Sequence, residues 1–340
     1  MAEPGTMHEG TGSEAQRRVD AANAVAAEAF LANGQREPVA GGAITPPDCD
    51  TGRGLMELVS FFRRTIDFPK PKWLTPLVQL LHVLLSSFNA SGREQDSMRE
   101  AQCLAAFLLL PGLIRYYMDK HRDVLQLLEG AQAAPQAHLY LLAAAQALIR
   151  SGEAKYGEDR PVRRSKNQMV DMVDDLCDRG RLSAAMTAIE RFAVEEANDG
   201  PSERPTRHQQ TVILDELHPY ATTADSLPSA RVGPVLTTPD LKDFEYVVRQ
   251  LRTSASPGAT GWTNALIRRV ALHDGHSEAL LLQMHKFVVR SMKGEVGVYA
   301  ADLLSTSRSV LIPKPDGGMR PLGVGEAWYR LIARCVCREV

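Results

Sequence analysis

Apolar residues recur at helical spacing in two stretches of the chain, and the segment between them lacks such a pattern. The first stretch begins at Leu55 and is rich in leucine. Prolines and glycines punctuate it, and the step Pro111-Gly112 interrupts its middle. Five helices are predicted there, at residues 55–66, 73–89, 97–110, 113–128 and 137–150. A series of amphipathic helices with leucine-rich faces is typical of an all-helical bundle.

The second stretch predicts four further helices and two strands. Thr238-Pro239-Asp240 is a good helix start, and Thr263 is suited to cap the next helix. Residues 309–324 read as two short strands around an Asp-Gly-Gly turn, which is a sequence suited to a β-hairpin loop. The predicted helices lie at residues 241–251, 264–270, 280–292 and 326–340.

The predicted hairpin places two cations opposite each other. Side chains alternate along a strand, so Lys314 is expected across the ladder from Arg320. Two like charges in that position repel each other, and an anion such as a polyphosphate would relieve the repulsion. Pro313 and Pro321 cannot donate to a ladder, which favours an edge position. The alternative is a surface hairpin with two solvated charges.

These patterns divide the chain into four parts. Residues 1–53 are predicted to be a disordered leader, because their Gly, Ala, Glu, Thr and Pro bury little apolar area. Residues 54–197 are predicted to be a helical domain, residues 198–237 a proline-punctuated linker, and residues 238–340 a second domain. The expected fold is therefore mainly α, with a small α+β module that carries the hairpin.

Two motifs of the second domain resemble the fingers of reverse transcriptases, most closely those of non-LTR retroelements. They are SASPGATGWTNALIRRV (254–270) and LIPKPDGGMRPLGVGEAWYRLIARCV (311–336). The resemblance implies an RNA-directed DNA polymerase fold in which Lys314 and Arg320 cover the triphosphate of an incoming deoxynucleotide. It also implies an RNA or RNA/DNA template as partner. AAFLLLPGLI (105–114) and MVDDLCDRGRLSAAMTAIERF (172–192) are weaker likenesses to the same family.

Further candidate contacts follow from residue type. Gly258 and Gly261 permit a close backbone approach, and a template strand is the candidate for that approach. Trp262 is expected to pack as an anchor under their turn rather than to stack on a base. Arg163, Arg164 and Lys166 form a weak candidate for phosphate contacts, with a solvated linker as the alternative.

Charge and cysteine content restrict the function classes. The formal net charge of −2 argues against a general polyanion binder, so any nucleic-acid contact is expected to be local. Five cysteines without a disulfide pattern favour a reducing compartment. No secretory signal and no apolar run long enough for a membrane span is visible, so an intracellular protein is expected, nuclear or cytoplasmic. Oligomeric state is left open.

The two magnesium ions of the intact polymerase family require aspartates from the palm, and none is found at a matching position; Asp174-Asp175 lies far upstream. The sequence therefore predicts a truncated fragment without catalytic or metal-binding residues, or a gene model whose palm is encoded downstream. The alternative is a non-catalytic helical interaction scaffold with a relic polymerase tail.

Overall fold

The computed structural model describes residues 45–62, 70–91, 97–151, 237–253, 255–273, 277–313 and 319–338, and four single positions between 173 and 189. The chain divides into two compact units. One contains the described parts of Met1–Tyr156, Ala230–Val310 and Leu322–Val340 and is called the helical unit below. The other comprises Gly157–Ser229 and Leu311–Pro321.

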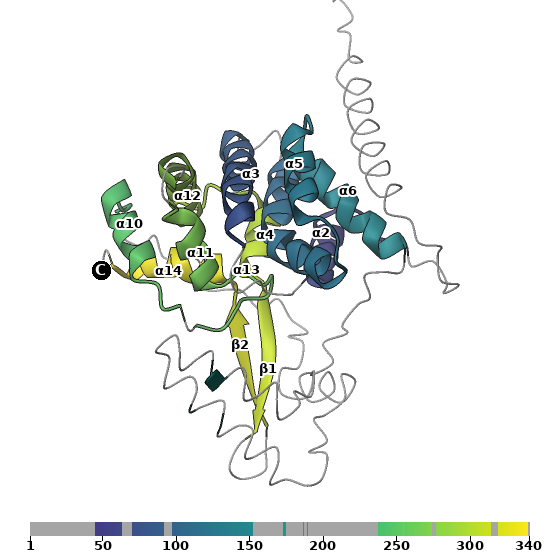
Figure 1. The fold of residues 1–340 in the computed structure, drawn as a ribbon. Helices are drawn as coiled ribbons and strands as arrows, with labels where there is room; N and C mark the ends of the chain where they lie inside the picture. Colours follow the sequence, from purple (N-terminus) through teal and green to yellow (C-terminus); the bar gives the residue numbers. More distant parts are fainter. Residues whose placement is uncertain are drawn as a thin grey trace, which may run out of the picture. The chain divides into compact units, whose positions relative to one another are not determined.

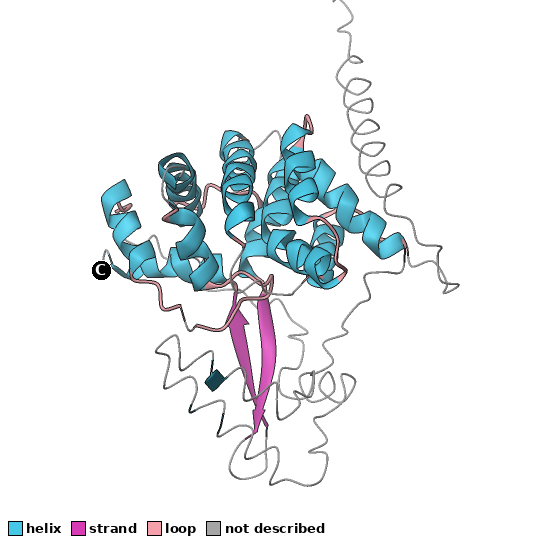
Figure 2. Ribbon diagram, viewed as in Figure 1, coloured by secondary structure: helices cyan, strands magenta, loops and turns pink. Residues whose placement is uncertain are grey.

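The described chain is mainly helical, as the sequence predicts (Figures 1 and 2). Helix α6 has the predicted bounds, and the caps of α10 and α11 are Asp240 and Thr263, whose side chains accept backbone N–H bonds. Helix α13 was not predicted. The helices are α2 (Gly52–Phe61), α3 (Pro71–Ala90), α4 (Ser97–Asp119), α5 (Val124–Ala133), α6 (Ala137–Arg150), α10 (Leu241–Arg249), α11 (Asn264–Ala271), α12 (Ser277–Met292), α13 (Val298–Ser305) and α14 (Ala327–Arg338).

The two helical stretches share one hydrophobic core, although the sequence analysis assigned them to separate domains. Helix α3 packs against α12, and α4 packs against α13. Figure 1 shows the purple and blue helices beside the green and yellow ones. At the centre, the rings of Phe107, Trp262, Phe287 and Trp328 lie within 4.9–6.4 Å of one another in their paired contacts. Helices 52–150 therefore supply part of the core of the 238–340 segment.

Helix α4 runs through Pro111, where the sequence analysis placed a break between two helices. Pro111 has no N–H, so the carbonyl of Phe107, four residues earlier, lacks its helical partner. Trp262 replaces that partner, because its Nε1 donates to the Phe107 carbonyl at 3.2 Å. Gly112 is required beside it, since an added Cβ would meet the Phe62 carbonyl oxygen. Among the described helices α4 alone is long and apolar enough to cross a membrane, and 83% of that apolar window is buried.

Two strands, β1 (Ser307–Pro313) and β2 (Met319–Gly325), pair in a two-stranded sheet, drawn in magenta in Figure 2. They are called the strand pair. Residues 307–310 and 322–325 belong to the helical unit and are called the strand base. Helix α13 ends directly before β1, and α14 begins directly after β2.

The first described residues pack on the helical unit, although the sequence analysis placed them in the leader. Gln146 donates to the Pro47 carbonyl at 2.8 Å. Gly54 lies so close to the backbone of Asp48 that no side chain would fit. The rest of the predicted leader, residues 1–44, and the predicted linker up to residue 236 lie outside the described residues.

Candidate functional site

The predicted triphosphate-binding residues belong to the strand pair and its connection. Arg320 is in β2, where the structure describes the backbone. Lys314 lies outside the described residues, as do the weak candidates Arg163, Arg164 and Lys166. The pairing of Lys314 with Arg320 across the ladder therefore stays a prediction.

The turn formed by residues 256–261, called the glycine turn below, lies against the start of α14. Gly258 is buried, and an added Cβ there would lie 2.6 Å from Glu326 Oε2 and 2.7 Å from the Ala327 nitrogen. Gly261 is also buried and has a φ of 90°, which disfavours any other residue. The close backbone approach that the sequence assigned to a template is thus made by the protein's own helix at Gly258. Ser256 is the exposed residue of this turn.

Trp262 anchors the glycine turn in the core, which confirms the expected packing role. Its side chain is 1% exposed and stacks on Phe107, with ring centroids 4.9 Å apart and planes at 23°. Within the turn, Gly258 N–H donates to the Trp262 carbonyl at 3.2 Å. The turn is therefore held to α4 at one end and to α14 along its middle.

Glu326 is a polar residue that contacts both the glycine turn and the residue before β1. It is fully buried, and its Oε2 accepts the Thr260 N–H at 3.0 Å. Its own N–H donates to the carbonyl of Thr306, directly before β1, at 3.2 Å. Burial raises the pKa of the Glu326 carboxyl above its ordinary value, and hydrogen bonds from Thr260 and Ala327 and the charge of Arg330 oppose that shift.

This raised pKa predicts a pH-dependent stability that Glu326→Gln removes. Above the ordinary value of 4.5 the unfolded chain loses the proton while the folded protein keeps it, so rising pH favours unfolding until the folded pKa is passed. The contribution of Glu326 is present below pH 4.5 and is lost above it. We expect the unfolding free energy of the wild type minus that of Glu326→Gln to fall between pH 4.5 and pH 7, as measured by urea titration.

Glu129→Gln is the control for this experiment, because Glu129 is exposed on α5. It reports what a Glu-to-Gln substitution does outside a buried site. A flat difference for Glu326→Gln would mean that the buried carboxyl ionises normally.

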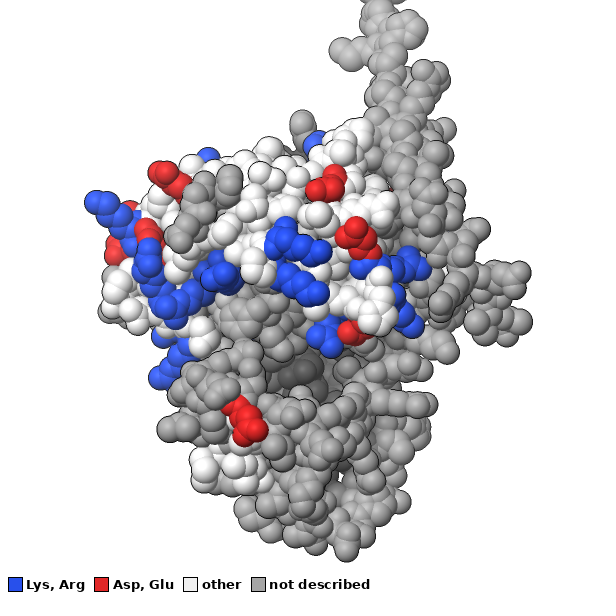
Figure 3. All heavy atoms as spheres, in the orientation of Figure 1, with Lys and Arg blue, Asp and Glu red and all other residues white. Residues whose placement is uncertain are grey.

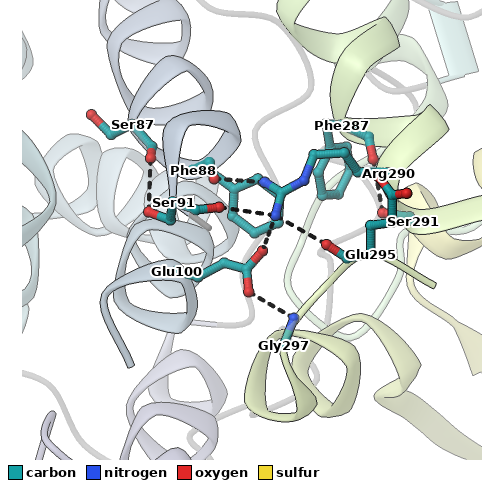
Figure 4. A network of polar contacts seen from close by, with 9 residues as sticks. All are labelled: Ser87, Phe88, Ser91, Glu100, Phe287, Arg290, Ser291, Glu295 and Gly297. Carbon is teal, nitrogen blue, oxygen red and sulfur yellow. Dashed lines mark hydrogen bonds and ion pairs between the residues drawn. The ribbon is translucent and has the colours of Figure 1, made fainter. Parts of the chain in front are cut away.

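A second buried carboxylate holds the segment that leads to α13 and the strand pair (Figure 4). Arg290 of α12 donates to Glu100 Oε1 of α4 at 2.8 Å and to the carbonyls of Phe88, Ser91 and Glu295 at 2.7–3.1 Å. The other carboxylate oxygen of Glu100 accepts the Gly297 N–H at 2.7 Å. Burial raises the pKa of the Glu100 carboxyl, against the hydrogen bond from Gly297 and the charge of Arg290. The arrangement ties α3, α4 and α12 to the residue before α13.

Positive charge gathers on one face of the helical unit. Figure 3 shows Lys and Arg side chains in a band across the drawn face, with fewer Asp and Glu between them. Arg268 and Arg269, in the last turn of α11, are both exposed. Exposed arginines of this kind are suited to phosphate oxygens, because the guanidinium offers a planar fork of donors.

A magnesium centre of the kind that polymerases use does not fit the residues that the structure describes. No three His, Cys, Asp or Glu side chains come together there in a way that would hold a metal ion. The four cysteines in the described ranges, Cys49, Cys103, Cys335 and Cys337, form no disulfide bond. No catalytic step through a metal is therefore derived for this chain.

Sequence reasoning missed Glu326, Glu100 and Arg290. Glu326 was counted only as the start of a helix, although it is an isolated acid between a glycine and an apolar helix. Nothing in the sequence pattern around Glu100 or around Arg290 indicates that the two residues pair, because 190 positions separate them.

Comparisons of this chain with protein-family models, with curated proteins and with solved structures found no match.

Proposed function

We propose that residues 238–340 are the fingers portion of an RNA-directed DNA polymerase of the non-LTR retroelement type, braced by the helices of residues 52–150. In this role the chain binds an RNA or RNA/DNA template and the triphosphate of a deoxynucleotide. The described residues include exposed arginines and no group of three His, Cys, Asp or Glu side chains that could hold a metal ion, so the proposed role of this part of the polymerase is binding and positioning rather than phosphoryl transfer.

One observation carries the proposal: the two sequence motifs that resemble polymerase fingers touch each other. Thr260 of the first motif donates to Glu326 of the second, although 66 positions separate them. Trp262 and Trp328 pack edge to face with centroids 5.3 Å apart. Motifs that resembled a family by chance would have no reason to share a buried contact. The pairing of β1 with β2 within the second motif adds support.

Arg320 and Lys314 have different roles in this proposal. The guanidinium of Arg320 binds two phosphate oxygens in a fork, and the ammonium of Lys314 supplies a compact charge. The exposed Arg268 and Arg269 are suited to template phosphates, which add affinity without sequence preference.

The experiment compares wild type, Arg320→Ala and Arg53→Ala. Binding of a fluorescent deoxynucleoside triphosphate is expected to weaken about 10- to 150-fold in Arg320→Ala, because a hydrogen bond to a charged group contributes about 1.5–3 kcal/mol. Arg53 has a side chain that is 90% exposed on α2 and pairs with Glu57, so Arg53→Ala should bind as the wild type does. Equal affinity of all three proteins contradicts the assignment of Arg320.

RNA binding and synthesis complete the test. The affinity for a labelled 20-nucleotide RNA should fall steeply with salt, because each phosphate contact releases counterions. The purified chain should incorporate no labelled deoxynucleotide on a primed template. Template-directed incorporation that is lost in Arg320→Ala would show that the chain does catalyse.

The second candidate is a helical interaction scaffold with a relic polymerase tail. The formal net charge of −2 and the shared helical core favour it. It predicts RNA binding no tighter than that of a neutral control protein, with no dependence on Arg320.

A further inference from the structure

The residue that follows the strand base, Glu326, contacts the glycine turn through its buried carboxyl group and the residue before β1 through its backbone. Glu326 lies between the end of β2 and the start of α14. Its backbone N–H bonds to Thr306, the residue before β1, and its Oε2 bonds to Thr260 of the glycine turn. The entry to β1, the exit from β2 and the glycine turn thus meet at one residue.

The same turn is tied to α14 a second time. Arg330, one helical turn after Glu326, donates from Nη2 to the Ser256 carbonyl at 2.7 Å. Gly258 leaves no room for a side chain between the two ties, because Glu326 Oε2 and the Ala327 nitrogen fill that space. Trp262 continues the turn into the core against α4. The turn therefore has no freedom to shift unless α14 and the strand base shift with it.

The Glu326 carboxyl group satisfies the buried Thr260 N–H, but it does so at a cost in desolvation. Glu326 is 0% exposed, and a buried ionisable group costs desolvation energy that an apolar residue of similar size avoids. What the carboxylate supplies is direction, because an acceptor oxygen at a fixed reach selects one placement of the Thr260 N–H. Groups that bind a triphosphate need such placement, since a site that is about 1 Å too loose loses affinity.

We propose that Glu326 is a positioning residue, which fixes the strand base against the glycine turn so that the strand pair is held for a nucleoside triphosphate. This inference rests on the proposed function, and it assigns the glycine turn a different task from template contact. The turn is the fixed contact of the strand base, and Glu326 links the two. Loss of the link leaves the helices folded and the strand pair badly placed.

The test uses the full chain with three substitutions at one position. Glu326→Gln keeps the reach and an acceptor oxygen, Glu326→Asp keeps the carboxyl group but is one methylene shorter, and Glu326→Ala removes both the reach and the acceptor. Hydrogen exchange is followed in peptides covering residues 256–263, 307–313 and 319–325, with a peptide of α12 as internal reference. We expect exchange to be at least tenfold faster in the three peptides of the Asp and Ala variants, with Gln close to wild type and α12 unchanged in all.

Triphosphate affinity supplies the functional readout. Glu326→Asp should bind the fluorescent deoxynucleoside triphosphate about as weakly as Arg320→Ala, and Glu326→Gln should bind as the wild type does. The double variant Glu326→Asp/Arg320→Ala should show no further loss, because both changes act through the strand pair. Glu129→Gln, which alters an exposed carboxyl group on α5, is the control and should retain affinity.

Different failures have different meanings. The inference is overturned if the three peptides of the wild type have no protection, if the Asp and Ala variants leave their exchange unchanged, or if exchange rises equally throughout the unit. Additive losses in the double variant also overturn it. If the wild type binds no triphosphate while the exchange pattern is as expected, the proposed function fails and the link through Glu326 stands.

Discussion

Trp262→Ala is expected to lower the free energy of unfolding of the helical unit by about 3–5 kcal/mol, the range for large aromatic truncations in a core. The indole is buried, stacks on Phe107 and packs edge to face on Trp328. Its removal opens a cavity between α4 and α14 and frees the end of the glycine turn. Urea unfolding followed by circular dichroism measures the change.

Trp262→Phe separates packing from hydrogen bonding at the same position. It keeps most of the ring contact but removes the Nε1 donor. The Phe107 carbonyl, which has no helical partner because residue 111 is proline, is then left unsatisfied. That loss is expected to cost about 1–3 kcal/mol, the cost of an unpaired buried polar group. Tyr329→Ala, at a site that is 51% exposed on α14, is the control and should change stability by less than about 0.5 kcal/mol. A Trp262→Phe variant as stable as the wild type would mean that the carbonyl finds another partner.

Pro111 shows why the helix boundaries of the first stretch were only partly predictable. A proline and a glycine in succession are normally a sound sign of a break, because proline removes a hydrogen bond and glycine weakens the helix. Here the missing bond is replaced by Trp262, which lies 155 positions from Phe107 in the sequence. A local pattern cannot reveal a partner at that distance. Helix α6, whose sequence has clear apolar spacing and no such interruption, was predicted with its observed bounds.

The division into two domains failed to anticipate the shared core for a related reason. Apolar spacing tells which face of a helix is buried but not which helix covers it. Helix α4 is buried on nearly all sides, and its apolar positions serve both the first and the second stretch. Composition changed at the predicted linker, so the sequence suggested two cores where the described residues have one.

The candidate site, too, was predictable where the signal is local in the sequence and not where the partner is remote. The sequence predicted paired strands at 309–324 and a packed Trp262, because alternation and a large aromatic beside glycines are local signals. It assigned the closeness of Gly258 to a nucleic acid, since the partner that excludes a side chain there, Glu326, is remote in sequence. Contact of a template with Gly258 or Gly261 stays a prediction.

Arg290→Met is expected to cost about 3–5 kcal/mol, because it leaves the fully buried Glu100 carboxylate without its counter-charge. Arg290 itself is 15% exposed at the side chain, so water replaces little of what the guanidinium supplies. The carbonyls of Phe88, Ser91 and Glu295 lose their donor as well. Arg249→Met is the matched control. That arginine pairs with Glu245 at a site that is 57% exposed, and such pairs contribute less than about 1 kcal/mol.

The double variant Glu100→Gln/Arg290→Met distinguishes the buried charge from the hydrogen bonds. Glutamine keeps an acceptor for the Gly297 N–H and removes the carboxylate, so the double variant should be more stable than Arg290→Met alone. Because Gly297 directly precedes α13, which leads into β1, the two variants should also differ in hydrogen exchange at residues 298–305. Urea titrations of both variants measure the first effect. If the double variant is the less stable one, the carboxylate at residue 100 is stabilised without Arg290, and the network of Figure 4 is held by its backbone carbonyl contacts instead.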